Sequence, residues 1–186
     1  MTYDLLEKEL KNGVLRSIYL FYGEETFLIE NCIKRIKKNF GEILQGINYV
    51  IIDESLVNDL IYNIESPAFG YDKKLIFVKN SGLFKKDGRK KVGSPIQESI
   101  AKYINENMDV IDENVNIIFY ETEVDKNNVY DAVNKNGIVC EFTELNQMQL
   151  VRRLKQICNG YKVNVNENVL AYLVEVSRNK FASFDK

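Results

Sequence analysis

The sequence predicts an α/β fold, with helices on both faces of a doubly wound parallel sheet of about five strands. Three observations lead to this prediction. The short apolar runs are continuous rather than alternating, which is typical of strands buried on both faces. Amphipathic segments lie between these runs, so strand and helix alternate along the chain. The 186 residues are 45% hydrophobic and 28% charged, which suits a globular chain with a sizeable core.

The elements expected in the first 142 residues are taken here in chain order. A first helix is expected over residues 3–11, ending before Gly13. Its inward residues should be Leu5, Leu6 and Leu10. Apolar runs predict strands at residues 18–22, 49–52, 75–78, 115–120 and 138–142. The helix after the first strand has an apolar stripe at helical spacing, formed by Ile29, Cys32, Ile33, Ile36 and Phe40. Shorter helices fit residues 55–65, 95–107 and 127–135.

The pattern changes after residue 142, where two more amphipathic helices are expected. The apolar side of the first is formed by Leu150, Val151, Leu154, Ile157 and Cys158. This helix should stop at Gly160, and Asn166 can cap the next one. The inner side of that last helix should hold Leu170, Leu173 and Val174. We therefore expect one α/β domain at residues 1–142 and the start of a small helical domain at residues 143–186.

Composition excludes several classes of function. Without histidine, the chain has no Ser-His-Asp triad, Cys-His pair or histidine-bearing metal site. The cysteines form no C-x-x-C pair, which predicts buried free thiols at Cys32, Cys140 and Cys158. Reduced cysteines, with no signal-peptide pattern and no apolar stretch of about 18 residues, indicate a cytoplasmic protein without membrane contact. A net charge of −2 gives no overall basic footprint for nucleic acid, and we expect no cofactor.

The turn after the first strand occupies the place where many nucleotide-binding α/β domains hold phosphate. Such a site needs a glycine-rich turn, available backbone N–H groups and a lysine. Here the turn has one glycine and two carboxylates, namely Gly23, Glu24 and Glu25. The carboxylates would stabilise the next helix by about 0.3–1 kcal/mol each and would repel a polyphosphate. We therefore expect capping acids at a degenerate phosphate site, and a plain strand-end turn rather than a metal pair at residues 53–54.

A large aromatic residue lies between two helix breakers just before the third strand. This segment consists of Pro67, Ala68, Phe69 and Gly70. Because proline fixes φ and glycine frees it, a tight turn is expected here. On such a turn, Phe69 either fills the core of its own domain or anchors the chain in the pocket of a partner. The residues alone leave both interpretations open.

Two groups of basic residues are candidates for contacts to DNA phosphates. The first lies on the polar face of the helix after the first strand and comprises Lys34, Arg35, Lys37 and Lys38. The second is the run at residues 85–91, within a predicted mobile surface loop at residues 80–94. Solvated surface is the commoner role of such charges, and phosphate contact is the alternative.

Three segments, in this order, resemble the delta subunit of the bacterial DNA polymerase III clamp loader. They are YLFYGEETFLIE at residues 19–30, PAFG at residues 67–70 and KKLIFVKN at residues 73–80. The resemblance implies an AAA+-like fold with a degenerate P-loop and no catalysis by the chain itself. It also implies that the chain binds and opens the ring-shaped sliding clamp, which is then loaded around primed DNA.

The resemblance assigns the clamp contact to the turn at residues 67–70. In that family, adjacent hydrophobic residues before the third strand enter a pocket on the clamp, and these map here to Ala68 and Phe69. Alanine stands where the family usually has a bulky residue, so most of the contact falls to Phe69.

Further partners and two alternative functions follow. The family joins other clamp-loader subunits through a C-terminal collar domain, which this sequence lacks, so we expect a fragment. The alternatives are a divergent nucleotide-binding enzyme, for which we find neither a phosphate cradle nor a general base, and an accessory DNA-binding protein that uses the basic residues.

Overall fold

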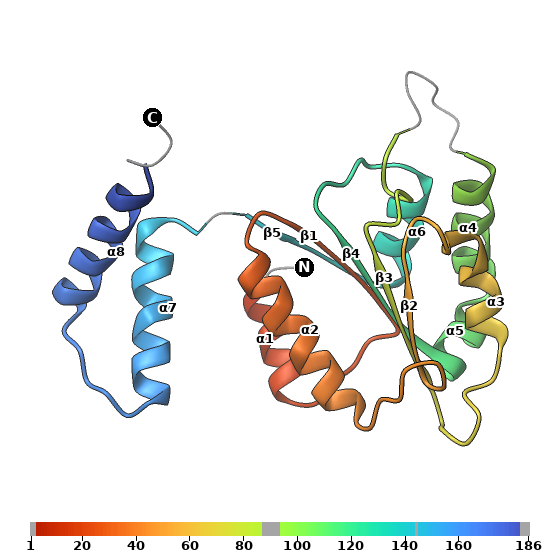
Figure 1. Cartoon of the computed structure of the whole chain (residues 1–186), viewed down its shortest axis with the longest axis horizontal. Coiled ribbons are helices and arrows are strands. Elements are labelled where there is room, and N and C mark those ends of the chain that lie inside the picture. Colours follow the sequence, from red (N-terminus) through yellow and green to blue (C-terminus); the bar gives the residue numbers. More distant parts are fainter. Residues whose placement is uncertain (1–2, 87–93, 144, 183–186) are drawn as a thin grey trace. The chain divides into compact units, whose positions relative to one another are not determined.

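Five parallel strands form the centre of the larger of two units, and helices cover both faces of the sheet (Figure 1). The computed structural model describes residues 3–86, 94–143 and 145–182, with side chains described up to residue 177. The units are Met1–Phe142 and Thr143–Lys186. The strand order is β2-β3-β4-β1-β5. The strands are β1 (Ile18–Gly23), β2 (Tyr49–Ile52), β3 (Lys74–Lys79), β4 (Val115–Glu121) and β5 (Ile138–Phe142).

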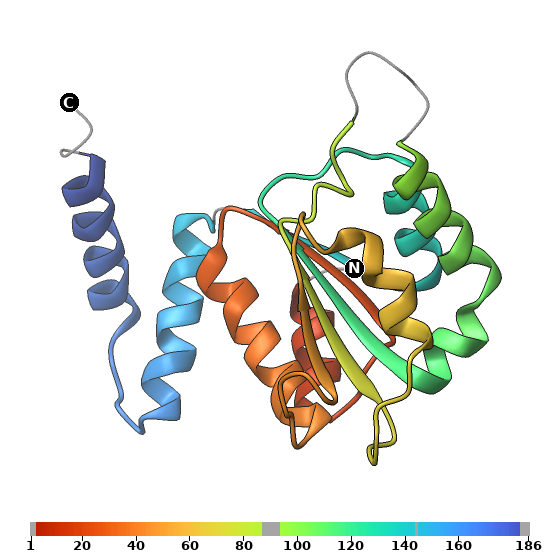
Figure 2. The same ribbon diagram turned by 45° about the vertical axis from the view of Figure 1, so that its right-hand side comes forward.

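The helices lie in two layers, as the two views in Figure 1 and Figure 2 both show. One face of the sheet carries α1 (Tyr3–Lys11) and α2 (Thr26–Phe40). The opposite face carries a short 3-10 helix and four α-helices. These are η1 (Val57–Asp59), α3 (Leu60–Glu65), α4 (Pro95–Glu106), α5 (Met108–Asn114) and α6 (Asn128–Asn136). The predicted fold class, an α/β fold with helices on both faces of a parallel sheet of about five strands, is confirmed.

The core has one layer on each side of the sheet because successive strand residues point to opposite faces. Ile18, Leu20 and Ile76 are fully buried in the cluster that also contains residues of α3, α4 and α6. Tyr19 and Phe21 alternate with them and are also fully buried, with ring centroids 5.5 Å apart. Burial on both faces explains why the strand runs are continuous in the sequence.

Several predicted details were wrong. The segment predicted as one helix at residues 55–65 begins as a turn, continues as η1 and becomes α-helical only at Leu60. Helix α5 was not expected, and among its seven residues only Ile111 is buried, too little for a periodic pattern. Leu5 is exposed rather than inward, whereas Leu6 and Leu10 are buried.

The predicted surface loop at residues 80–94 begins inside the core. Ser81, Leu83 and Phe84 are buried, and the Phe84 ring meets that of Phe119 edge to face at 5.3 Å. The polar and glycine residues around this short apolar pair gave it the appearance of a loop. Most of the basic run at residues 85–91, namely residues 87–91, lies outside the described residues.

The second unit consists of α7 (Gln147–Gly160) and α8 (Glu167–Ala182). Asn146 begins α7 with a capping box, and Lys155 of α7 forms an ion pair with Glu167 of α8. None of the residues of α7, all of which the structure describes, is buried. Leu170 and Val174 of α8 are buried, but Leu173 is exposed, contrary to the prediction.

The three cysteines differ in burial. Cys32 and Cys140 are buried and form no disulfide, as predicted, whereas Cys158 is only half-buried. Cys158 belongs to α7, where two helices alone provide too little apolar surface to cover a thiol.

Candidate functional site

The segment at residues 67–70 lies beyond the amino ends of the parallel strands, shortly before β3 begins. This is the lower part of the larger unit in Figure 1. Helix α3 ends at Glu65, and Ser66 is already extended with φ −73° and ψ 141°. Proline disfavours a helical conformation in the residue before it, so Pro67 explains this helix end. The chain then has to turn before Lys74 begins β3.

The turn itself has an uncommon backbone. Phe69 has a φ of 35° and Gly70 a φ of 92°, and the N–H of Tyr71 donates to the carbonyl of Ala68 at 3.3 Å. Two central residues with positive φ characterise a type I′ turn. Glycine adopts this conformation freely, but a left-handed phenylalanine costs about 1–2 kcal/mol. Such strain is found preferentially at functional positions.

The side chain of Phe69 is 77% exposed. The interpretation of Phe69 as a core residue therefore does not hold. Pro67 and Gly70 are also exposed, and Ala68 is partly buried. A strained, exposed aromatic ring on a tight turn is a geometry suited to binding a partner.

A buried lysine ties the two ends of this turn together, and sequence reasoning missed it. The Lys74 side chain donates to the carbonyls of Asn63 and Ser66, each at 2.9 Å, and to Oγ of Ser66 at 2.7 Å. Lys74 is only 3% exposed, and burial lowers the pKa of its ammonium group. The available signal was a lysine at the first position of a strand whose next four residues are apolar.

The degenerate phosphate turn lies at the opposite end of the sheet, where the parallel strands have their carboxyl ends. Gly23 has a φ of 119°, and a side-chain carbon there would overlap the carbonyl oxygen of Phe142 and lie 2.9 Å from its carbonyl carbon. The N–H of Glu25 donates to that same carbonyl oxygen at 3.1 Å. The glycine thus permits close packing against β5, and one N–H that a phosphate would need is already used.

The acids of this turn do not cap α2 in the expected way. Glu25 is the N-cap residue of α2, but within the described residues its side chain makes no capping hydrogen bond. Glu24 is exposed. Their charges still lie near the positive end of the helix dipole, where a carboxylate is favourable and a polyphosphate is repelled.

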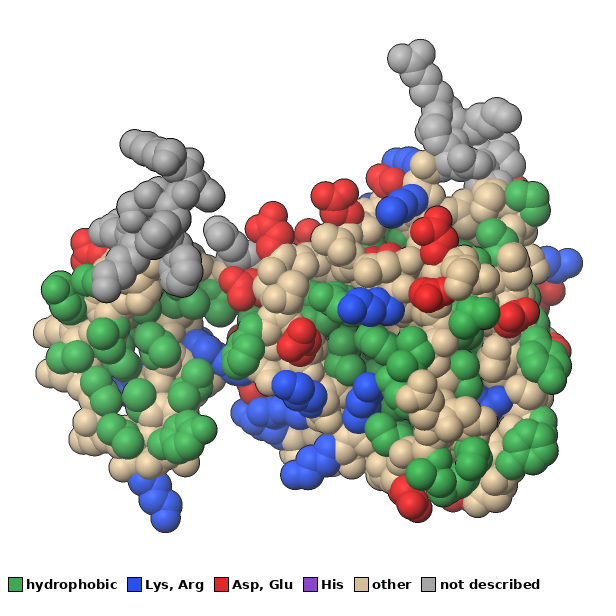
Figure 3. Space-filling model, viewed as in Figure 1, with side chains coloured by type: hydrophobic (Ala, Val, Ile, Leu, Met, Phe, Trp, Pro, Cys, Tyr) green, Lys and Arg blue, Asp and Glu red, His purple; other side chains and the backbone are tan. Residues whose placement is uncertain are grey.

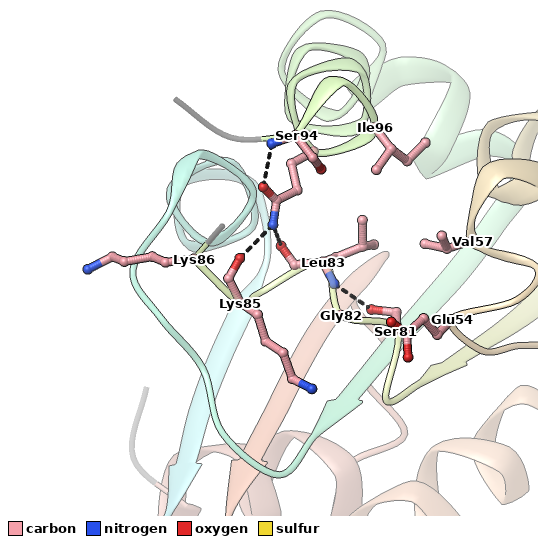
Figure 4. A pocket seen from close by; sticks show the side chains of 10 residues that line it. Glu54, Val57, Ser81, Gly82, Leu83, Lys85, Lys86, Ser94 and Ile96 are labelled. Carbon is pink, nitrogen blue, oxygen red and sulfur yellow. Dashed lines mark hydrogen bonds between the residues drawn. The ribbon is translucent and has the colours of Figure 1, made fainter. Parts of the chain in front are cut away.

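A pocket of about 330 Å³ lies near the carboxyl ends of β2 and β3 (Figure 4). The Gln97 side chain spans part of it, donating to the carbonyls of Leu83 and Lys85 and accepting from the N–H of Ser94. Both N–H donors of its amide are therefore used within the chain. Charged residues of both signs also line this pocket, namely Glu54, Lys85 and Lys86.

The acidic pair at residues 53–54 forms the strand-end turn that was predicted. Oδ1 of Asp53 accepts from the N–H of Ser55 at 2.9 Å and from its hydroxyl at 2.6 Å. These hydrogen bonds lower the pKa of Asp53. In the part of the chain that the structure describes, no cluster of acidic or cysteine side chains could hold a metal ion.

The basic residues of α2 divide into two pairs. Arg35 lies 3.5 Å from the carboxylate of Glu7, and Lys37 donates to the hydroxyl of Tyr49 at 2.6 Å. Lys34 and Lys38 are exposed. Figure 3 shows Lys and Arg side chains beside hydrophobic ones on the visible face of the larger unit. Arg35 and Lys37 therefore already have partners within the chain, and Lys34 and Lys38 remain exposed.

Comparison with known proteins places these features in a family. The family model for the DNA polymerase III delta subunit matches residues 19–143. The chain belongs to the DNA polymerase III delta subunit family. The match extends from β1 to the end of β5, so it includes both the turn at residues 67–70 and the degenerate phosphate turn.

A curated sequence and a solved structure, both from Bacillus subtilis, are similar to this delta-family chain. The DNA polymerase III subunit delta is 29% identical over 83 residues, which cover 43% of this chain and 24% of that protein. The solved DNA clamp loader delta protein matches with a TM-score of 0.70 and 19% identity, over 92% of this chain and 51% of that one. The chain thus spans about half the length of its structural relative and shares its fold. Among the described helices of the delta-family chain, none has the length and apolar character needed to span a bilayer.

Proposed function

We propose that this chain is a clamp-loader subunit that binds the ring-shaped sliding clamp and helps to open it for loading onto primed DNA. One observation carries the proposal. Phe69, in a chain of the delta family, is exposed on a tight turn and is not part of the hydrophobic core. An aromatic ring presented in this way can enter a preformed pocket without a large rearrangement.

The four residues of the turn have different proposed roles. Phe69 supplies the ring that enters the clamp, because complete burial of such a side chain contributes about 1.5–3 kcal/mol. Ala68 adds little area and is already partly buried. Pro67 and Gly70 shape the turn, the first by ending α3 and the second by accepting a positive φ.

We propose that the chain itself is non-catalytic and needs no cofactor. The closed packing of Gly23 against Phe142 and the two carboxylates beside it support this proposal, because they disfavour nucleotide phosphate at the usual position. The further proposed partners are the other clamp-loader subunits and primed DNA. Lys34 and Lys38 are the proposed contacts to DNA phosphates, since both are exposed.

The proposal is tested by the affinity of the chain for the sliding clamp of its own organism. Phe69→Ala should weaken binding by about 30-fold or more, because loss of an aromatic anchor costs about 2–4 kcal/mol. Its free energy of unfolding should stay within about 0.5 kcal/mol of the wild-type value, since Phe69 is exposed. Surface plasmon resonance and urea unfolding measure the two quantities.

Phe27→Ala is the matched control. Phe27 is also an exposed phenylalanine, at 61%, but it lies at the start of α2 beside the degenerate phosphate turn. Its replacement should change clamp affinity less than two-fold. If Phe69→Ala folds normally and binds the clamp as tightly as the wild type, the proposed anchor is wrong.

A further inference from the structure

The turn at residues 67–70 needs support from its flanks. Its central residue, Phe69, has a strained backbone and an exposed side chain, so packing of the ring does not hold it in place. One backbone hydrogen bond closes the turn, from Tyr71 to Ala68. A left-handed phenylalanine persists when the surrounding structure determines it.

Lys74 supplies a connection between the two flanks. On one side of the turn, its ammonium group holds Asn63 and Ser66, at the end of α3 and directly before Pro67. On the other side, its own backbone is the first residue of β3 and pairs with Val115 of β4. The entry and the exit of the turn are therefore fixed to each other and to the sheet.

The chemistry of this contact matches a lysine closely. An ammonium group has three N–H donors, and three oxygen acceptors lie within 2.9 Å of it. The two carbonyls lie at the negative end of the α3 dipole, which favours a cation. An apolar residue at this position would avoid the desolvation of a charge, so burial alone does not account for the lysine.

We propose that Lys74 is a positioning residue that fixes the Phe69 turn in the conformation that binds the clamp. The inference rests on the proposed function, in which Phe69 is the anchor. When a variant adopts the competent conformation only part of the time, its apparent affinity falls by that fraction. Loss of Lys74 should therefore weaken binding even though Lys74 itself is buried.

The test compares Lys74→Met with Lys73→Met. Methionine keeps the length and apolar stem of lysine without its donors. Lys73 is the neighbouring lysine, and it donates to the carbonyl of Asp112 in α5 rather than to the turn. We expect Lys74→Met to weaken clamp binding by about 10-fold, as for a turn that is competent in one molecule in ten. Lys73→Met should change it less than two-fold.

A second measurement follows the turn without the clamp. The sequence has no tryptophan, so Phe69→Trp places a single indole on the turn, and its fluorescence can be excited at wavelengths that the 11 tyrosines do not absorb. Adding Lys74→Met to this variant should lower the fluorescence anisotropy of the indole, and adding Lys73→Met should not. Should Lys74→Met fail to fold, Ser66→Ala removes only the hydroxyl acceptor and should give a smaller change in the same direction.

A double-mutant cycle separates positioning from general structural damage. If Lys74 acts through the turn, Phe69→Ala combined with Lys74→Met should bind no more weakly than Phe69→Ala alone. Additive losses would overturn the inference, and so would unchanged anisotropy and affinity in Lys74→Met. Failure of the proposed function gives a different result, in which Phe69→Ala leaves clamp binding intact while Lys74→Met still lowers the anisotropy.

Discussion

Glu121 is a buried carboxylate at the end of β4. Its Oε1 accepts from the N–H of Ser81 at 2.8 Å and from the Ser81 hydroxyl at 2.6 Å. These bonds hold the segment after β3 against β4, close to the buried Phe84. Burial raises the pKa of Glu121 above its ordinary value of 4.5, and the hydrogen bonds from Ser81 oppose this shift. Glu121 therefore holds two segments together through hydrogen bonds while burial disfavours its charged form.

The pH dependence of this residue has a defined sign. Because the pKa is raised in the folded chain, the folded state binds the proton of Glu121 more tightly than the unfolded state does. Its contribution to the free energy of unfolding is complete below pH 4.5 and is lost as the pH rises through the folded-state pKa. Glu121→Gln keeps an acceptor for Ser81 and removes the charge. We expect it to raise the free energy of unfolding at pH 7 by about 1 kcal/mol, with a smaller gain at pH 4.

Urea unfolding at several pH values measures this difference. Glu42→Gln is the control, because Glu42 is exposed. Its replacement should change the free energy of unfolding by nearly the same amount at each pH. A Glu121→Gln variant whose gain does not grow between pH 4 and pH 7 would contradict the account of the buried charge.

At the scale of elements, the joint between β1, α2 and β5 depends on the small size of Gly23. Gly23→Ala should lower the free energy of unfolding through backbone strain and through overlap with the carbonyl of Phe142. Gly41→Ala isolates the strain, since Gly41 has a φ of 102° and no described atom within 4 Å of an added carbon. We expect Gly41→Ala to cost about 1–3 kcal/mol and Gly23→Ala at least about 2 kcal/mol more.

Thermal and urea unfolding of the two glycine variants measure this contrast. The folded fraction of Gly23→Ala should still bind the clamp, because the proposed anchor, Phe69, lies at the opposite ends of the strands. Equal losses in the two variants would mean that close packing against β5 is not the reason for the glycine.

The elements differ in how far their residues predict them. Strands such as β4 were predicted because a strand that is buried on both faces consists of mostly consecutive apolar residues. The burial of Leu83 and Phe84 depends on contacts with distant residues such as Phe119, so their local neighbours suggested a loop. Helix α5 was missed because only one of its residues is buried.

The candidate site was predictable to a similar extent. The breakers around Phe69 predicted a turn, but only the three-dimensional contacts could decide whether its ring points into the core. Lys74 was not predicted because a lysine is seldom buried, and its acceptors become visible only when α3 is placed beside β3. Lys37 was placed on a solvated face, although Tyr49 lies within reach of its amine.

At the scale of the whole molecule, the two ends of the parallel strands carry different turns. The closed turn at Gly23 lies at the carboxyl ends, and the turn with the exposed Phe69 lies at the amino ends. Both lie in the unit Met1–Phe142, which also contains every residue of the main core cluster. We therefore propose that this unit is an independent domain and that the helices after it are not needed for clamp binding.

This division is tested with a shortened chain of residues 1–142. Because its core is complete within the unit, we expect cooperative thermal unfolding and a clamp affinity within two-fold of that of residues 1–186. A peptide of residues 143–186 should unfold without a cooperative transition, since α7 buries no side chain and α8 buries Leu170 and Val174 among its described residues. Circular dichroism melts and plasmon resonance measure these outcomes. If residues 1–142 fold but lose more than 10-fold in clamp affinity, the helical unit takes part in clamp binding, and the Phe69 turn is then only one part of the contact.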